Sequence, residues 1–382
     1  MKVPNALARL HIGIAGAGLL GRLLAFELTR AGHQVEVYDP APDALGRGAA
    51  GWTAAGMLSP IAELEGADAA VFAMGLRSLV RWPQLLAGFC ESTVPVEFHQ
   101  RGSLLVAHRG DEGAARRVVD LLKHKAPPEF APQALAISDL RELEPAIHGC
   151  AHAWMLPGEG QIHTVQAMTA LHHAAMQQGA QWHWGETVQR VSASVLHTAK
   201  GDRSYDWVFD VRGTGARPST VLEDENNGFK SQVRGDQFGF TPQVRGVRGE
   251  IFWLDAPGVV LHRPVRLLHP RHRVYIVPRQ VGQIVVGASE IESEDRTPVS
   301  LRSTLELLSA AHSILPELAE ARIVHSESNL RPALPDNLPR LETSPGLTRI
   351  NGLFRHGWLI APALVEQAMT EMLQFEEIKE AA

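Results

Sequence analysis

The stretch LHIGIAGAGLLGRLLAFELTRAGHQVEVYD, residues 10–39, contains the pattern that decides the fold. Residues 10–15 form a short apolar run, which is typical of a strand buried in a parallel sheet. Leucines then recur at helical spacing, and Gly32 marks the end of the helix. Residues 35–39 predict a second strand, which ends in Asp39. The stretch therefore predicts a βαβ unit, because such a unit spans about 30 residues.

Three glycines between the first strand and the helix have the spacing of a dinucleotide-binding loop. Gly16 permits a tight turn, Gly18 lets the backbone approach a pyrophosphate, and Gly21 lets the helix pack closely on the strand. The pyrophosphate then faces the positive end of the helix dipole. Asp39 is placed to accept hydrogen bonds from ribose hydroxyls. We interpret the stretch as a nucleotide-binding site; the loop alone does not distinguish NAD from FAD.

The composition is that of an ordinary soluble protein. The chain has 382 residues, with 45% hydrophobic and 20% charged, and its length predicts two or three domains. The net charge of −6 provides no positive field for nucleic acid or anionic lipid. Two cysteines favour a reducing, cytoplasmic compartment, and no spacing typical of metal ligands occurs. We expect no nucleic-acid partner, no metal and no transmembrane segment; the oligomeric state stays open, a homo-oligomer included.

Further along the chain, helical and strand patterns alternate. The expected helices are 67–82, ending before Pro83; 112–124; 164–178, capped by Thr164; 300–315; and 359–375, with Pro362 in or before its first turn. The expected strands are 103–107, 181–184, 187–192, 207–211, 250–254, 274–278 and 284–288. The polar, Gly-rich residues 223–239 predict a loop. This order predicts an α/β nucleotide domain interrupted by a second, sheet-based domain.

A run of small residues, GWTAAGML at 51–58, follows the second strand. Small residues let the backbone lie flat against a planar ring, with its N–H groups free to donate hydrogen bonds. A close-packed loop against a helix explains the run equally well. From the residues alone, neither interpretation is favoured over the other.

Taken together, these motifs resemble the D-amino-acid-oxidase family of FAD-dependent oxidoreductases, most of all the glycine oxidases of thiamine biosynthesis. The resemblance rests on the glycine loop, the loop at 54–58 and four later segments in the family's order. Those segments are 157–161 (PGEGQ), 274–279 (VYIVPR) with 285–288 (VVGA), 330–336 (LRPALPD) and 354–363 (FRHGWLIAPA). It covers nearly the whole chain.

The resemblance implies an α/β fold with a Rossmann-like FAD-binding domain and a second, α+β domain built on a mixed, mostly antiparallel sheet. The FAD-binding domain would combine residues 8–85, 145–220 and 323–382. The substrate-binding domain would combine residues 86–144 and 221–322. FAD would be bound non-covalently.

The resemblance also implies the reaction. A small amino acid or amine, of the glycine, sarcosine or D-amino-acid kind, would lose a hydride to the flavin, and the imine would hydrolyse. Oxygen would reoxidise the flavin and give hydrogen peroxide. A dehydrogenase that passes electrons to a quinone or another carrier is the alternative. Two further hypotheses, an NAD-linked oxidoreductase and a flavin-binding module without activity, explain fewer of the motifs.

Three residues are expected to handle the substrate. By the resemblance, Arg331 would clamp its carboxylate, Tyr275 would add its hydroxyl, and Arg355 would lie near flavin and substrate. Without the resemblance, we would interpret Arg331 as one partner of a surface ion pair and Tyr275 as a half-buried aromatic residue of a strand. The expected FAD-binding residues are Gly16, Gly18, Leu19, Leu20, Gly21, Asp39, Thr53, Ala54, Ala55, Gly56, Met57, Val188, Gly213, Gly215, Arg331, Arg355, His356, Gly357, Trp358, Leu359 and Ile360.

Some residues depart from the family pattern. Glu290 stands near an apolar pocket residue of glycine oxidases, and its carboxylate would repel an acidic substrate and attract a cationic one. Residues 262–273, rich in Arg and His, would form either a solvated strand edge or a pocket rim that recruits an anionic substrate. Arg212 and Arg217 would contact FAD phosphates or face solvent. Glycine itself is therefore not assured as the substrate.

Overall fold

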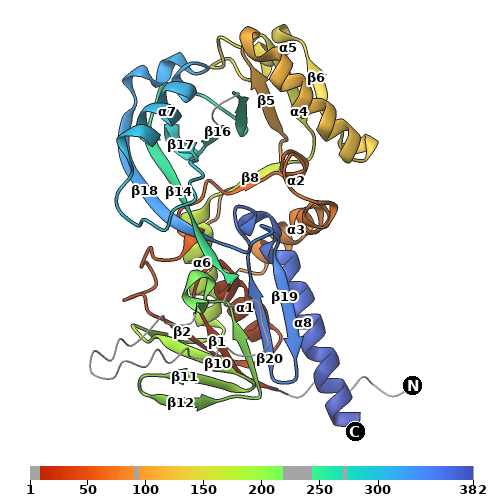
Figure 1. Cartoon of the computed structure of the whole chain (residues 1–382), viewed down its shortest axis with the longest axis vertical. Helices are drawn as coiled ribbons and strands as arrows, with labels where there is room; N and C mark the ends of the chain where they lie inside the picture. Colours follow the sequence, from red (N-terminus) through yellow and green to blue (C-terminus); the bar gives the residue numbers. More distant parts are fainter. Residues whose placement is uncertain (1–8, 90–93, 218–242, 270–272, 382) are drawn as a thin grey trace, which may run out of the picture.

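The two largest sheets of the computed structural model lie at opposite ends of an elongated molecule (Figure 1). The structure describes residues 9–89, 94–217, 243–269 and 273–381. The loop predicted at 223–239 lies outside these residues. The architecture confirms the expected fold class, because one sheet is mostly parallel with helices and the other is mostly antiparallel.

The predicted βαβ unit forms the centre of a six-stranded sheet. β1 (His11–Ala15) pairs in parallel with β2 (Gln34–Asp39), and α1 (Leu19–Arg30) connects them. The sheet has the order β19-β20-β13-β1-β2-β9. The other strands are β9 (Gln181–Trp184), β13 (Trp207–Asp210), β19 (Arg340–Ser344) and β20 (Leu347–Asn351). The βαβ prediction is confirmed.

Different layers cover the two faces of this sheet. On one face, α1 packs against α6 (Thr164–Gln177) and α8 (Gly357–Ala381), and α3 (Ala69–Ala87) packs on α8. The other face carries a small sheet of β10 (Val188–Ser192), β11 (Val195–Thr198) and β12 (Gly201–Ser204). Alternate residues of β1, such as Ile12 and Ala15, therefore face different cores.

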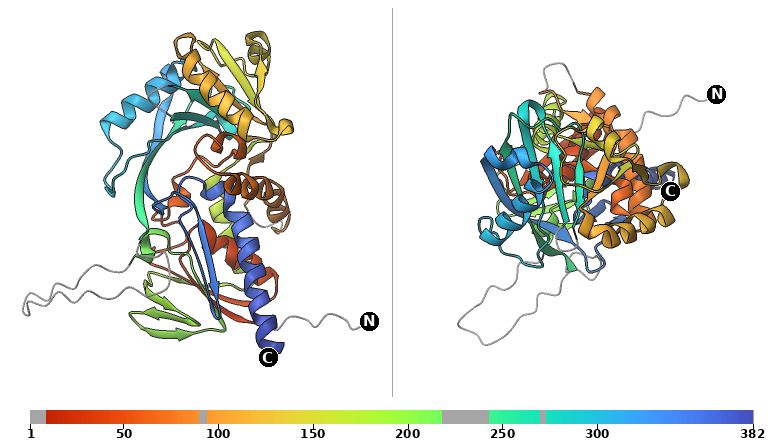
Figure 2. Two further views of the ribbon diagram at one scale, coloured as in Figure 1. Left: turned by 45° about the vertical axis from the view of Figure 1, so that its right-hand side comes forward. Right: turned by 90° about the horizontal axis from the view of Figure 1, so that it is seen from above.

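The second large sheet has eight strands in the order β18-β14-β17-β16-β15-β5-β7-β6 (Figure 2). Its strands are β5 (Ser103–Ala107), β6 (Gln133–Leu135), β7 (His152–Leu156), β14 (Arg245–Asp255), β15 (Val265–Leu268), β16 (Arg273–Pro278), β17 (Gln283–Gly287) and β18 (Arg322–Ala333). Among the described strands of this sheet, only β15 and β5 pair in parallel. The helices at this end are α4 (Glu112–Lys125), α5 (Ile137–Leu143) and α7 (Leu301–His312). A three-stranded sheet of β3 (Met57–Leu58), β8 (Gly160–Ile162) and β4 (Phe98–His99), with α2 (Pro60–Glu63), lies between the ends.

Two helices run through prolines that were expected at or beyond their ends. α3 continues past Pro83 to Ala87, because Trp82 is fully buried, stacks on Trp358 of α8 at 5.6 Å and donates to its carbonyl. Pro83 itself lies on the exposed face of the helix. α8 begins at Gly357, so Pro362 lies inside it, beyond the first turn. Tertiary packing outweighs the cost of about 3 kcal/mol for an interior proline.

Two smaller expectations also need correction. The cap of α6 is His163, whose Nδ1 accepts from the Gln166 N–H at 3.4 Å, and Thr164 is the first helical residue. β14 covers Arg245–Asp255, because it pairs with β18 over that whole length, and not only 250–254.

The division into two discontinuous domains remains a prediction. Among the described residues, no helix is long and apolar enough to cross a membrane. Within the same ranges, no group of three or more His, Cys, Asp or Glu side chains could hold a metal ion.

Candidate active site

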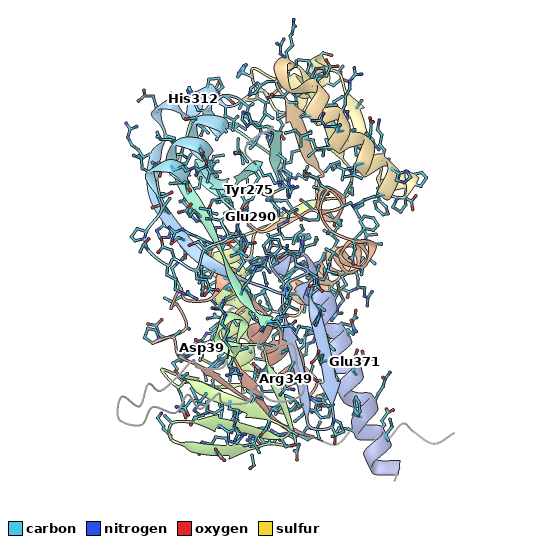
Figure 3. All side chains as sticks on the ribbon, in the orientation of Figure 1. Asp39, Tyr275, Glu290, His312, Arg349 and Glu371 are labelled. Atoms are coloured by element: carbon cyan, nitrogen blue, oxygen red, sulfur yellow. The ribbon has the colours of Figure 1, made fainter. Side chains whose placement is uncertain are left out.

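Two cavities meet between the large sheets. The lower cavity, of about 530 Å³, starts at Asp39 and the glycine loop. The upper cavity, of about 560 Å³, reaches Tyr275 and Glu290 at the eight-stranded sheet (Figure 3). Both volumes fall within the range of about 300–1,000 Å³ typical of small-molecule sites. The two cavities share the wall residues Thr53, Ala54, Arg331, Arg355 and Trp358.

The lower cavity fits a bound dinucleotide. Gly18 caps α1 without any side-chain hydrogen bond, so the first N–H groups of the helix are left for a ligand. A Cβ on Gly21 would lie 1.9 Å from the carbonyl oxygen of Gly16, so only glycine lets the helix start so close to the strand. Asp39 lines the same cavity and accepts hydrogen bonds from the N–H groups of Ala17 (2.6 Å) and Ala41 (2.9 Å). This arrangement can hold the pyrophosphate and ribose of FAD.

The structure brings most of the predicted FAD-binding residues to the cavity walls. Those on the lower cavity are Gly16, Gly18, Leu19, Leu20, Asp39, Thr53, Ala54, Val188, Gly213, Gly215, Arg331, Arg355, Gly357 and Trp358. Ala55, Gly56 and Met57 line the upper cavity. Four predicted residues line neither cavity: Gly21, His356, Leu359 and Ile360. The roles of all these residues stay predictions.

Contacts with neighbouring segments hold the small-residue loop at 54–58 in place. The Thr164 hydroxyl donates to the Ala54 carbonyl at 3.0 Å, and a Cβ on Gly56 would lie 2.0 Å from the Ile162 carbonyl oxygen. The buried guanidinium of Arg279 donates to the carbonyl of Ala55 and, at 3.3 Å, to that of Ile162. The close-packed interpretation is therefore confirmed. The loop also forms part of a cavity wall, and its contact with a planar ring stays a prediction.

Arg331 lies where the cavities meet and has no carboxylate within ion-pair distance among the described residues. Its guanidinium donates to the backbone carbonyls of Ser289 at 3.0 Å and Arg248 at 3.4 Å. It lies flat on β14, because a Cβ on Gly249 would be 2.4 Å from its Cζ. A positive charge held by neutral carbonyls is a ready site for a ligand carboxylate.

Tyr275 lies on β16 in the wall of the upper cavity. Burial raises the pKa of its phenol, while the nearby Arg331 opposes that effect, so the hydroxyl stays protonated at neutral pH. It has no hydrogen-bond partner within the described ranges of the chain. It is therefore available as a donor to a ligand bound by Arg331.

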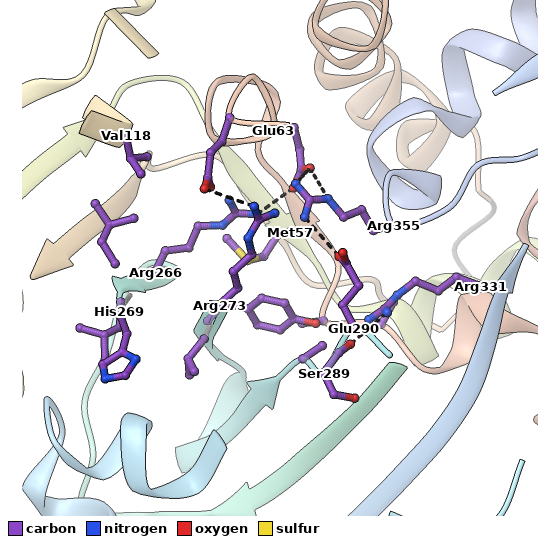
Figure 4. Close-up of a pocket in the computed structure, with 18 of the residues that line it drawn as sticks. Met57, Glu63, Val118, Arg266, His269, Arg273, Ser289, Glu290, Arg331 and Arg355 are labelled. Carbon is purple, nitrogen blue, oxygen red and sulfur yellow. Dashed lines mark hydrogen bonds and ion pairs between the residues drawn. The ribbon is translucent and has the colours of Figure 1, made fainter. Parts of the chain in front are cut away.

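Glu63, which the sequence did not single out, organises the charges of the site (Figure 4). Its carboxylate accepts from Nε of Arg355 at 2.9 Å and from Nη2 of Arg266 at 2.7 Å, and Nδ1 of His356 lies at 3.1 Å. Burial alone would raise the pKa of Glu63, but Arg355, Arg266 and His356 hold it well below its usual range. Glu63 thus fixes Arg355 at the junction of the cavities. A lone acid after a small-residue loop gave no signal of this role.

The residues that depart from the family pattern separate into groups. Glu290 lines the upper cavity, with one oxygen 3.4 Å from Nη1 of Arg355. From the segment 262–273, Arg266, His269 and Arg273 line the same cavity. His262 and Arg263 instead contact the buried Glu144, and residues 270–272 lie outside the described chain. The strand-edge interpretation is wrong, because β15 lies between β16 and β5 in the sheet. Recruitment of an anionic substrate by the cavity-lining part of the segment stays a prediction.

The two arginines after β13 are engaged by carboxylates. Arg212 lines the lower cavity but donates twice to Asp210, at 2.9 and 2.8 Å. Arg217 pairs with Glu294 and lines neither cavity. Of the two, only Arg212 lies where an FAD phosphate could approach.

Comparison with known proteins agrees with this geometry. The family model described as FAD dependent oxidoreductase matches residues 11–370. The chain belongs to this family. It is thus an FAD-dependent oxidoreductase, as the motifs predicted.

Individual members of this oxidoreductase family resemble the chain over nearly its full length. A Rhizobium etli protein named as thiamine biosynthesis oxidoreductase ThiO is 34% identical, with 95% of this chain and 97% of that protein aligned. The glycine oxidase of Geobacillus kaustophilus is 26% identical, with 93% and 90% aligned. The crystal structure of that glycine oxidase superimposes with a TM-score of 0.79 over 96% of this chain and 95% of its own.

Proposed function

We propose that the protein oxidises the C–N bond of a small amino acid or amine, of the glycine, sarcosine or D-amino-acid kind. The observation that carries the proposal is Arg331, a guanidinium without a carboxylate partner in the described chain, at the junction of the lower and upper cavities. Relatives named as glycine oxidases support it. We further propose non-covalent FAD, a cytoplasmic location and the two discontinuous domains.

The side chains of the site orient the substrate. Arg331 binds its carboxylate in a planar, two-point contact, which a lysine could not copy. The Tyr275 hydroxyl donates to the same carboxylate, and Glu290 faces the amino group. FAD, when bound, supplies the hydride acceptor. The protein thereby holds the α-carbon at the junction of the two cavities.

The pH dependence of activity should follow the substrate amine. No basic side chain is needed if the amine is already neutral, so we expect kcat/KM to rise with pH toward the amine pKa. Steady-state rates between about pH 6 and 10 test this, because substrate ionisation should appear in the profile. A flat profile over that range would contradict the prediction.

A substrate screen tests the proposal as a whole. Peroxide release and anaerobic flavin bleaching are recorded in parallel with glycine, sarcosine, N-ethylglycine, D-amino acids, L-proline and small diamines. Bleaching with rapid reoxidation in air identifies an oxidase. Bleaching with slow reoxidation identifies a dehydrogenase that uses a quinone or another carrier. The proposal fails if no amino acid or amine bleaches the flavin.

Substitution of Gly249 tests the position of Arg331. In Gly249→Ala, the three atoms nearest the added methyl group all belong to the flexible end of the Arg331 side chain, so we expect the fold and FAD binding to survive. We expect KM to rise and kcat/KM to fall by about 100-fold, the order expected for a misplacement of about 1 Å. Gly258→Ala is the matched control, since no atom lies within 4 Å of its added Cβ. Unchanged kinetics of Gly249→Ala would contradict the assigned role of Arg331.

A further inference from the structure

The walls of the upper cavity carry more positive than negative charge. Five arginines face three glutamates there: Arg117, Arg266, Arg273, Arg331 and Arg355 against Glu63, Glu65 and Glu290. The excess is two positive charges, before His269 is counted. One excess charge is explained by Arg331, which awaits the α-carboxylate of the substrate. The other has no role in the proposed function.

The local ion pairs show where the second charge lies. Glu63 binds Arg266 and Arg355, and Glu65 lies 3.4 Å from Arg273. Arg117, on the exposed surface of α4, has no carboxylate within ion-pair distance among the described residues. It therefore lies at the outer end of the cavity with its charge available.

The inner and outer ends of the cavity lie on opposite sides of Arg273. Figure 4 shows Arg331 and Glu290 on one side, Val118 and His269 on the other, and Arg273 between them. Apolar side chains line the outer part: Ala114, Val118 and Leu121 of α4, and Leu267 and Leu268 of β15. An apolar wall that leads to unpaired positive charge suits a short hydrocarbon arm that ends in an anion.

We propose that the site prefers amino acids that carry a second carboxylate at the end of a short apolar arm. Arg117 binds this distal carboxylate, assisted by Arg273, which also pairs with Glu65, while Arg331 binds the α-carboxylate. The inference rests on the proposed function, because the inner carboxylate must be bound first. The arm extends either from the nitrogen, as in N-carboxyalkyl glycines, or from the α-carbon, as in D-glutamate.

Binding of unreactive analogues to the FAD-loaded enzyme tests the preference without turnover. In the thioether (2-carboxyethylthio)acetate, sulfur replaces the amine and a distal carboxylate is present. In the thioether (propylthio)acetate, a methyl group replaces that distal carboxylate. Titrations followed by the flavin spectrum should show the diacid binding about tenfold more tightly, a free-energy difference of about 1.4 kcal/mol. The ratio should shrink with added salt, because Arg117 is exposed.

Variants at the outer end locate the effect. Arg117→Gln and Arg273→Gln should each lower the ratio, and the double variant should bring it to about one. Arg116→Gln is the matched control, because Arg116 lies on the same helix, pairs with Glu112 at 2.6 Å and does not line the cavity. A wild-type ratio of one or less overturns the inference, and so does a ratio that the double variant leaves intact.

The outcomes separate the inference from the proposed function. If the monoacid binds without a preference for the diacid, only the inference fails. If neither acid perturbs the spectrum of the bound flavin, the carboxylate site at Arg331 is wrong and both fail. Turnover of N-(2-carboxyethyl)glycine against N-propylglycine, and of D-glutamate against D-norvaline, then shows which arm carries the distal carboxylate.

Discussion

Replacement of Arg331 by alanine should lower kcat/KM for the substrate by about 30- to 5,000-fold. The estimate follows from the loss of about 2–5 kcal/mol when one partner of a buried, hydrogen-bonded charge pair is removed. The loss should appear mainly in KM if the contact is equally strong in the ground and transition states. Steady-state kinetics and the absorbance of bound FAD, measured on the same preparation, check both points.

Two further variants make the Arg331 result specific. Arg331→Lys keeps the charge but loses the planar two-point contact, so it should recover only part of the activity. Arg340→Ala removes an exposed arginine that pairs with Asp336 at 3.2 Å, and its kinetics should match the wild type. Wild-type kinetics in Arg331→Ala would leave the carboxylate site without its main residue.

Replacement of Glu63 by glutamine should have the second largest effect. The change leaves Arg355, Arg266 and His356 without their shared carboxylate in a buried setting. Breaking a buried ion pair from one side costs about 3–5 kcal/mol. We expect the free energy of unfolding to fall by that amount and FAD to be held more weakly, because Arg355 loses its anchor at the cavity junction. Urea unfolding and FAD titration measure the two effects.

Acid pH provides an independent test of Glu63. Its pKa in the folded protein lies well below the usual 4.5, so its contribution to stability is complete above about pH 4.5 and is lost as the pH falls through the folded pKa. Glu63→Gln should lack this part of the acid dependence. Glu65→Gln is the control, because Glu65 is partly exposed, pairs with Arg273 at 3.4 Å and should cost less than about 1 kcal/mol. Equal losses in both variants would contradict the special role of Glu63.

The parts of the fold that depend on local spacing could be predicted from the sequence. The glycine loop, α1 and the strands on either side of it follow from residues within one stretch of about 30 positions. The ends of α3 and α8 could not be predicted, because local rules stop helices near Pro83 and Pro362. The burial of Trp82 against Trp358, which keeps α3 helical, joins residues far apart in the chain.

The candidate site divides in the same way. Arg331 and Tyr275 stood in recognisable motifs, and the structure brings both to the upper cavity. Glu63, Gly249 and Arg117 gave no signal, because their importance arises only from what lies opposite them. Gly249 matters for the guanidinium that lies on it, and Glu63 for three cations from distant segments. Such pairings across the fold have no pattern in one sequence.

The lower cavity is lined by residues from distant parts of the chain, Gly16 and Trp358 among them. During translation, Gly16 leaves the ribosome long before α8 has been made. The βαβ unit can fold early, but it cannot enclose the whole cofactor until the last helix joins it. Loading of FAD is therefore a late event in the life of the nascent chain, and chains that end before Gly357 should emerge colourless.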